Sequence, residues 1–196
     1  MSTPPGRPEL TPALGFAPEL LLKAQGIRLA IFDVDGVLTD GRIYISERGE
    51  EFKAFSTLDG QGLKLLALGG ITPIVITGRD SPAVRRRVTD LGIAHAVYGA
   101  HDKLAAATPL LAALGLAWPA VAAMGDDWPD LPLMSRAGFA CAPANAPIEV
   151  QAIAHHVTVA SGGHGAAREC CDLLLVAAGR YADLLRGHLV TLDGAG

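Results

Sequence analysis

The chain has 196 residues, of which 50% are hydrophobic and 18% are charged, and its formal net charge is -4. This balance is typical of one globular domain, and it argues against nucleic acid as the main partner. No apolar run is long enough to cross a bilayer, and the start of the chain lacks the pattern of a signal peptide, so we expect no membrane partner. The three cysteines form no disulfide framework and suit a reducing, cytoplasmic environment.

Strand and helix patterns alternate along most of the chain. Residues 1–18 are rich in proline and are interpreted as a flexible lead-in, and residues 181–196 as a C-terminal tail. The predicted strands cover 29–32, 71–77, 94–98, 120–124, 138–141 and 156–160, and the predicted helices cover 19–26, 59–68, 81–91, 102–114, 145–154 and 166–178, with a short helix ending near 136.

Residues 42–55 predict a β-hairpin with Gly49 at its turn. The other strands alternate with helices through short links, which favours a parallel sheet covered on both faces. The expected fold is therefore α/β, with a Rossmann-like, doubly wound, mostly parallel sheet over residues 19–180 and a hairpin after the first strand.

Two carboxylates follow the first predicted strand. Residues 29–32 are an apolar run typical of a strand buried on both faces, and Asp33 and Asp35 come next. Side chains two apart on an extended segment point the same way, and paired carboxylates repel unless a cation compensates them. Aspartate is also an ordinary turn residue, but a position directly after a continuous apolar strand favours the functional interpretation.

Further polar side chains follow the other strands of the sheet. They are Thr77, Lys103, Asp126, Asp127 and Asp130. Ligands of open α/β sheets bind beyond the carboxyl ends of the strands, so we expect all these groups in one crevice. Carboxylates and a main-chain carbonyl there suit Mg²⁺, a carboxylate can attack phosphorus, and a second can act as general acid and base. A hydroxyl and an ammonium can hold the phosphoryl oxygens.

These motifs resemble, in order, those of the haloacid dehalogenase-like phosphohydrolases. The matching stretches are residues 33–40, residues 76–79, Lys103, and residues 125–130. The resemblance implies that Asp33 is the nucleophile, Asp35 the general acid/base, and Thr77 and Lys103 phosphate ligands.

The same resemblance implies a Mg²⁺ ion held by Asp33, Asp126 and Asp35, the last through its main chain. Asp127 and Asp130 are then expected to orient the metal shell and Lys103. The gaps between the motifs hold only the hairpin and βα units, so no cap domain is expected.

A closer resemblance, over about residues 20–179, is to the 3-deoxy-D-manno-octulosonate 8-phosphate phosphatases. The hairpin and the stretches 55–62 and 162–175 carry it. It implies release of phosphate from an eight-carbon sugar acid of lipopolysaccharide synthesis, by a homotetramer whose neighbouring subunits help to close the site. The implied substrate-binding residues are Asp35, Asp59, Gly60, Thr77, Gly78, Arg79, Lys103 and Arg168.

Two alternatives remain open from the sequence. His164 and Leu58 stand where relatives have arginine, so a related nine-carbon sugar-acid phosphate is a second candidate substrate. A receiver-type signalling module also gathers acidic residues, a threonine and a lysine at strand ends. Its phosphate acceptor lies on the third strand, however, where this chain offers only residues 97–99.

Overall fold

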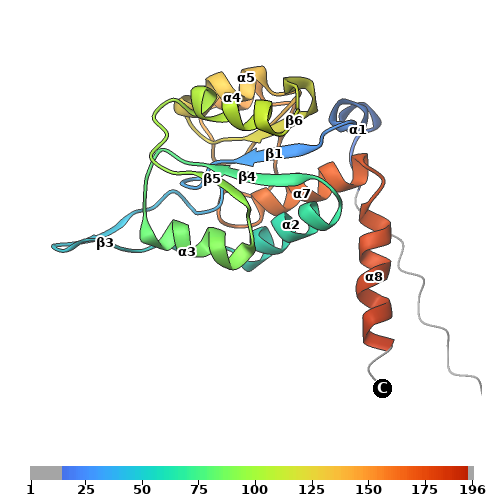
Figure 1. Cartoon of the computed structure of the whole chain (residues 1–196), viewed down its shortest axis with the longest axis horizontal. Coiled ribbons are helices and arrows are strands. Elements are labelled where there is room, and N and C mark those ends of the chain that lie inside the picture. The colour runs from blue at the N-terminus through green and yellow to red at the C-terminus, as the bar shows by residue number, and fades with distance from the viewer. Residues whose placement is uncertain (1–14, 194–196) are drawn as a thin grey trace, which may run out of the picture.

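The computed structural model describes residues 15–193 (Figure 1). Residues 1–14 of the predicted lead-in and residues 194–196 of the predicted tail lie outside the described residues. The elements in chain order are α1 Pro18–Ala24, β1 Leu29–Phe32, β2 Tyr44–Ser46, β3 Gly49–Phe52, α2 Thr57–Leu68, β4 Thr72–Ile76, α3 Pro82–Leu91, β5 His95–Val97, α4 Lys103–Ala113, η1 Trp118–Ala120, β6 Val121–Met124, η2 Trp128–Asp130, α5 Leu131–Arg136, β7 Phe139–Ala142, α6 Ile148–Ile153, β8 His156–Val157, α7 Ala166–Ala177 and α8 Tyr181–Asp193.

Six strands form one sheet in the order β5-β4-β1-β6-β7-β8, and every pairing in it is parallel. From β1 the chain adds β4 and β5 outward on one side and then β6, β7 and β8 outward on the other. This reversal of direction at β1 confirms the predicted doubly wound α/β fold. All four residues of β1 are buried. Phe32 pairs with Val75 on β4 and with Met124 on β6, so these three strands end at the same edge.

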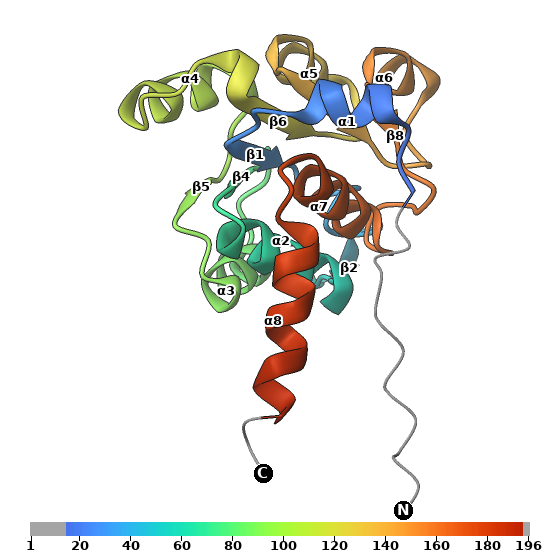
Figure 2. The ribbon, with the colours of Figure 1, turned by 90° about the vertical axis from the view of Figure 1, so that its right-hand side faces the viewer.

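Helices cover both faces of this sheet (Figure 2). On one face, α2, α3 and α7 pack through side chains such as Leu63, Val84 and Leu174. On the other, α4, α5 and α6 pack through Leu111, Met134 and others. The apolar sequence of β1 therefore faces two separate cores, as expected for a strand buried on both faces.

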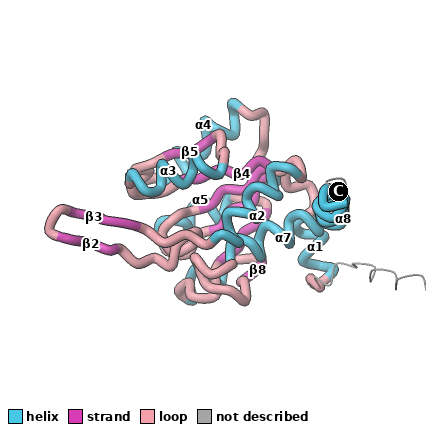
Figure 3. The backbone as a smooth tube through the Cα atoms, turned by 90° about the horizontal axis from the view of Figure 1, so that it is seen from below, coloured by secondary structure: helices cyan, strands magenta, loops and turns pink. Residues whose placement is uncertain are grey.

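The β2–β3 hairpin extends away from the body of the chain (Figure 3). It is antiparallel, and Tyr44 stacks on Phe52 with ring centroids 4.6 Å apart. Ile45 and Phe52 are 70% and 58% exposed. The hairpin is the only sheet structure between β1 and α2, in agreement with the predicted absence of a cap domain.

Several predicted elements differ in extent from the observed ones; the helix predicted over 145–154, for example, is observed as α6 over Ile148–Ile153. Two further differences involve contacts with α7. The strand expected over 156–160 pairs at His156 and Val157, and the N–H of Thr158 adds one bond to Ala142 O of β7. Pairing stops there because the N–H of Ala160, the next that would face β7, donates to the Glu169 carboxylate instead. The segment after residue 180 is helical as α8, and Tyr181 and Leu184 pack against the core beside α7. Over residues 15–193, no helix combines the length and the apolar character that a membrane crossing needs.

Candidate active site

A cleft of about 370 Å³ opens at the edge where β1, β4 and β6 end. Because Phe32, Val75 and Met124 are level in the sheet, the residues that follow them reach this cleft together. Most of the predicted site residues line it. The lining residues are Asp33, Asp35, Gly41, Thr77, Gly78, Arg79, Ala100, His101, Lys103, Asp126, Asp127, Pro129 and Asp130.

Three carboxylates converge in the cleft. Oxygens of Asp33, Asp126 and Asp130 lie within 4.8 Å of one another. Burial, and next the charge of Asp130, raise the pKa of Asp33 to about 6 against the opposing effect of Lys103. Burial, followed by the charges of Asp33 and Asp130, raises the pKa of Asp126 to about 8. The folded chain therefore disfavours the ionised forms of both carboxyls.

Three buried carboxylate oxygens in this cleft accept no well-directed hydrogen bond from the described residues. They are Asp35 Oδ2, Asp126 Oδ1 and Asp33 Oδ1, of which Asp33 Oδ1 forms an ion pair with Lys103. Buried oxygens of this kind are costly unless a ligand or ion satisfies them. A hard cation takes oxygen ligands of this type, so Asp33 and Asp126 fit a Mg²⁺ site.

Lys103 is the cation of the acidic group. It is the first residue of α4, whose N-cap Asp102 accepts a hydrogen bond from Ala105 N at 2.9 Å. Its Nζ lies 2.6 Å from Asp130 Oδ1 and 2.8 Å from Asp33 Oδ1. Burial alone would lower the pKa of Lys103, but the two carboxylate charges outweigh burial and raise it. Lys103 is therefore held as a cation at the centre of the cleft.

Asp130 has both of its oxygens occupied by the protein. Oδ1 accepts from Lys103, and Oδ2 accepts from the backbone N–H groups of Asp126 and Asp127 at 3.2 and 3.4 Å. This carboxylate fixes the lysine and the loop after β6, and it has less capacity to bind a metal than Asp33 or Asp126.

Asp35 contacts a residue that the sequence interpretation missed. Lys53 Nζ lies 2.5 Å from Asp35 Oδ1, and Arg79 Nε lies 3.8 Å from Oδ2. The signal was a lysine placed between Phe52 and Phe55, because a lysine in an apolar run needs a buried acceptor. The interpretation also missed His101, which lines the cleft from the link between β5 and α4.

Asp59, Gly60 and Arg168 lie outside this cleft. Asp59 is 1% exposed and caps the start of α7, where Oδ1 accepts from Arg168 N at 2.8 Å and Oδ2 from Gly165 N at 3.2 Å. Gly60 packs closely against the Arg87 side chain, since a Cβ at position 60 would lie 2.3 Å from Arg87 Nη2. The Arg168 guanidinium pairs with Asp172 at 2.8 Å.

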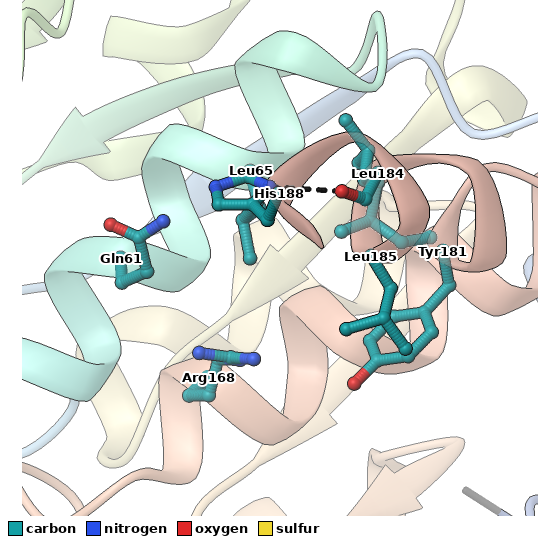
Figure 4. Close-up of a pocket in the computed structure, with 8 residues that line it drawn as sticks. Gln61, Leu65, Arg168, Tyr181, Leu184, Leu185 and His188 are labelled. Carbon is teal, nitrogen blue, oxygen red and sulfur yellow. Dashed lines mark hydrogen bonds between the residues drawn. The ribbon is translucent and has the colours of Figure 1, made fainter. Parts of the chain in front are cut away.

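Arg168 also lines a separate, mostly apolar cavity of about 230 Å³ between α2, α7 and α8 (Figure 4). Leu65, Tyr181, Leu184 and His188 line it as well, and His188 Nδ1 bonds to Leu184 O at 2.9 Å. None of the described residues that line this cavity carries a carboxylate, so the chemistry expected from the motifs belongs to the acidic cleft.

Comparisons with known proteins identify the family of this chain. A family model described as haloacid dehalogenase-like hydrolase matches residues 97–169. The 3-deoxy-D-manno-octulosonate 8-phosphate phosphatase of Salmonella typhimurium is 44% identical over 84% of this chain and 87% of its own length. A crystal structure of a probable YrbI family phosphatase from Pseudomonas syringae superposes with a TM-score of 0.86 at 48% identity, covering 88% of this chain and 98% of that one.

A further solved structure is the 3-deoxy-D-manno-octulosonate 8-phosphate phosphatase of Moraxella catarrhalis, in complex with a magnesium ion, a phosphate ion and the sugar acid. It has a TM-score of 0.83 at 40% identity, and covers 87% of this chain and 98% of that one. Identity at this level over most of both chains shows common membership. This chain belongs to the 3-deoxy-D-manno-octulosonate 8-phosphate phosphatase family of haloacid dehalogenase-like hydrolases.

Proposed function

We propose that this chain hydrolyses 3-deoxy-D-manno-octulosonate 8-phosphate to the free sugar acid and phosphate, with Mg²⁺ as cofactor. The observation that carries the proposal is the convergence of the carboxylates Asp33, Asp35 and Asp126 in one cleft around the cation Lys103. Each of the three has one buried oxygen that accepts no well-directed hydrogen bond from the described residues. The names of the relatives supply the substrate. The family assignment also makes a receiver-type module the weaker interpretation.

In the first step, a carboxylate oxygen of Asp33 attacks phosphorus, and the bond from phosphorus to the sugar oxygen breaks. Asp35 gives its proton to that leaving oxygen, and Asp33 carries the phosphoryl group as an aspartyl-phosphate. Asp33 and Asp35 line the same cleft, which the mechanism requires.

In the second step, water attacks the phosphorus of the aspartyl-phosphate. Asp35 takes a proton from that water, the bond between phosphorus and the Asp33 oxygen breaks, and Asp33 returns as a carboxylate while phosphate leaves. Thr77 and Lys103, both on the cleft wall, hold the phosphoryl oxygens through both steps.

The residues that would hold Mg²⁺ are Asp33 and Asp126, with the main chain of Asp35. When bound, the ion neutralises the phosphoryl charge that develops beside these carboxylates. Asp127 and Asp130 orient the loop that presents Asp126, as the two N–H contacts to Asp130 suggest.

We assign substrate-binding roles to the predicted residues according to whether they line the cleft. Asp35, Thr77, Gly78, Arg79 and Lys103 line the cleft, and they are proposed to contact the substrate directly. A contact by Asp59, Gly60 or Arg168 remains a prediction, because these residues lie elsewhere in the single chain. His164 and Leu58 keep a nine-carbon sugar acid as the alternative substrate.

We further propose a homotetramer in the cytoplasm, acting in lipopolysaccharide precursor synthesis. The exposed apolar side chains of the hairpin, Ile45 and Phe52 among them, need cover from other subunits. The described cysteines are free and buried, as in a reducing compartment. Sedimentation velocity tests the assembly: a tetramer is expected, and a monomer at micromolar concentration would refute it.

The function is tested by phosphate release from a panel of eight- and nine-carbon sugar-acid phosphates and simple hexose phosphates. Each is assayed with Mg²⁺ and with a chelator. A preference for the eight-carbon compound that disappears with the chelator supports the proposal. Mg²⁺-dependent preference for a nine-carbon compound would transfer the assignment to that substrate, and the absence of release from every compound would overturn the enzyme assignment.

A further inference from the structure

Lys53 reaches the catalytic cleft from the base of the hairpin. It follows β3 directly, and its side chain is fully buried. Its Nζ contacts Oδ1 of Asp35, a residue 18 positions earlier in the chain. A buried ammonium is costly and needs a specific acceptor, so this contact is a defined feature of the site.

The chemistry of an ammonium decides which oxygen of Asp35 can carry a proton. Lysine has three N–H donors and no acceptor. The oxygen that it contacts can therefore only accept, and when Asp35 is protonated its proton must lie on the other oxygen. That other oxygen, Oδ2, accepts no hydrogen bond from the described residues. The nearby Arg79 Nε lies 3.8 Å away, beyond hydrogen-bond distance.

We propose that Lys53 is a positioning residue that directs the acidic proton of Asp35 to Oδ2, the oxygen that accepts no hydrogen bond from the described residues and from which the leaving group would take the proton. This inference rests on the proposed phosphatase function and on the acid role of Asp35. In the first step the Oδ2–H bond breaks, and the proton goes to the sugar oxygen as its bond to phosphorus breaks. Lys53 donates to Oδ1 throughout and keeps its own protons.

The proposal predicts a dependence on the leaving group. A sugar alkoxide leaves only if it is protonated, whereas p-nitrophenolate leaves without a proton. A variant that misplaces the Asp35 proton therefore loses rate on sugar phosphates and retains it on p-nitrophenyl phosphate. The measured quantity is kcat/KM, because it reports the steps through the first phosphoryl transfer and excludes the later attack by water.

Three substitutions of Lys53 separate positioning from packing. Lys53→Met removes the donor. Lys53→Gln keeps a polar side chain whose amide oxygen can accept, so the proton of Asp35 is no longer confined to Oδ2. Lys53→Arg keeps a side chain that only donates. The matched control is Lys64→Gln, since Lys64 is an exposed lysine on α2.

With wild type active on the sugar phosphate, Lys53→Met and Lys53→Gln are expected to lower its kcat/KM by roughly 10²-fold, the usual range for general acid catalysis. Their kcat/KM for p-nitrophenyl phosphate is expected to stay within a few-fold of wild type. Lys53→Arg is expected to recover a large part of the loss, and Lys64→Gln to match wild type on both substrates. Thermal unfolding checks the fold of each variant, and Lys53→Gln alone suffices if Lys53→Met does not fold.

Equal losses on the two substrates in folded variants would overturn the inference, because they would indicate a packing role. Unchanged kcat/KM on the sugar phosphate would overturn it as well. Asp35→Asn separates this failure from a failure of the proposed function. If Asp35→Asn shows the leaving-group dependence and the Lys53 variants do not, only the role of Lys53 is wrong. If wild type releases no phosphate from any sugar phosphate with Mg²⁺, the proposed function itself fails.

Discussion

The molecule buries aspartates in two regions, the catalytic cleft and the start of α7. The carboxylates of the two regions differ in how fully they are hydrogen-bonded. Asp33 in the cleft is 7% exposed and Asp59 at α7 is 1% exposed. Burial is the largest cause of a raised pKa at both. Asp59, however, has each oxygen bonded to a backbone N–H of the α7 start, whereas Asp33 Oδ1 accepts no well-directed hydrogen bond.

This difference separates a structural carboxylate from a functional one. The Asp59 carboxylate satisfies two N–H groups at a helix start and connects α2 to α7, so it stabilises the fold. The cleft carboxylates crowd one another, and each leaves one oxygen without a well-directed hydrogen bond, so they lower the stability of the folded chain. Unsatisfied oxygens, rather than burial or charge, identify the site that a ligand completes.

The largest expected effect comes from Asp33→Asn. Loss of the nucleophile is expected to lower kcat by roughly 10⁴- to 10⁶-fold. The thermal midpoint in a chelator at neutral pH is expected to stay the same or to rise, because the amide removes a carboxylate that the fold disfavours in its ionised form. Activity assays and thermal unfolding on the same sample check both parts. Near-normal turnover, or a large fall in the midpoint, would contradict the contrast drawn between the two regions.

Gly162→Ala acts where the loop before α7 touches the cleft. A Cβ on Gly162 would lie 1.7 Å from Gly36 O, in the turn that follows Asp35. Backbone must move to accommodate it, so we expect a loss of about 3 kcal/mol in unfolding free energy, together with reduced kcat.

Gly187→Ala is the matched control for that change, because the added Cβ on α8 would meet no described atom within 4 Å beyond its chain neighbours and the backbone of its own helix. Alanine in a helix interior is expected to raise stability there by about 0.5–1 kcal/mol. Denaturant unfolding measures both variants. Equal stability of the two would show that the close contact at Gly162 is not what fixes this loop.

Asp59→Asn makes the same substitution as Asp33→Asn in the structural region. The asparagine NH₂ group must face one of the two backbone N–H groups, which leaves a buried donor unpaired and costs about 2 kcal/mol. The value of kcat/KM for p-nitrophenyl phosphate is expected to stay within a few-fold of wild type. Denaturant unfolding and the assay together check this. A catalytic loss as large as that of Asp33→Asn, without loss of stability, would show that Asp59 has a catalytic role and not a structural one.

A smaller effect is expected from pH in the absence of metal. The pKa of Asp126 is about 8 in the folded chain, against an ordinary value of 3.8. Between these values the folded chain holds a proton that the unfolded chain has released, so the contribution of Asp126 to stability falls as pH rises from about 4 to about 8. In a chelator, the thermal midpoint of wild type relative to Asp126→Asn should decline over this range.

Mg²⁺ should reverse that trend, because it binds the ionised carboxylate. The rise in the wild-type midpoint on adding Mg²⁺ is expected to be larger at pH 8 than at pH 5, and small in Asp126→Asn. Calorimetric scans with and without the ion measure it. A rise of equal size in the two proteins would place the ion elsewhere.

The sequence predicted the cleft well because its residues follow apolar strands. Phe32 and Met124 end neighbouring strands in register, so Asp33 and Asp126 could be brought together by pattern alone. Asp59 was predicted, from the family resemblance, to bind the substrate. Its observed hydrogen bonds join it to residues 106 and 109 positions away in the chain. No local pattern shows whether such distant donors satisfy a carboxylate.

Long-range contacts also explain what the sequence interpretation missed. Lys53 is buried where the hairpin returns its base to Asp35, a partner 18 positions earlier in the chain. The strand after α6 is shorter than predicted because Glu169 on α7 accepts from the N–H of Ala160, which would otherwise extend the pairing. Side chains from distant elements decided each of these cases.

The most direct test of the account is to trap the phosphorylated aspartate. Asp35→Asn is incubated with Mg²⁺ and p-nitrophenyl phosphate, a substrate that needs no acid to react, and then quenched and treated with borohydride, which reduces an acyl phosphate to an alcohol. Because the base for its hydrolysis is missing, the intermediate should accumulate, and peptide mass spectrometry should find homoserine at position 33 alone. Reduction at Asp59, at Asp126 or at no aspartate would contradict the claim that the unsatisfied carboxylate of Asp33 is the nucleophile.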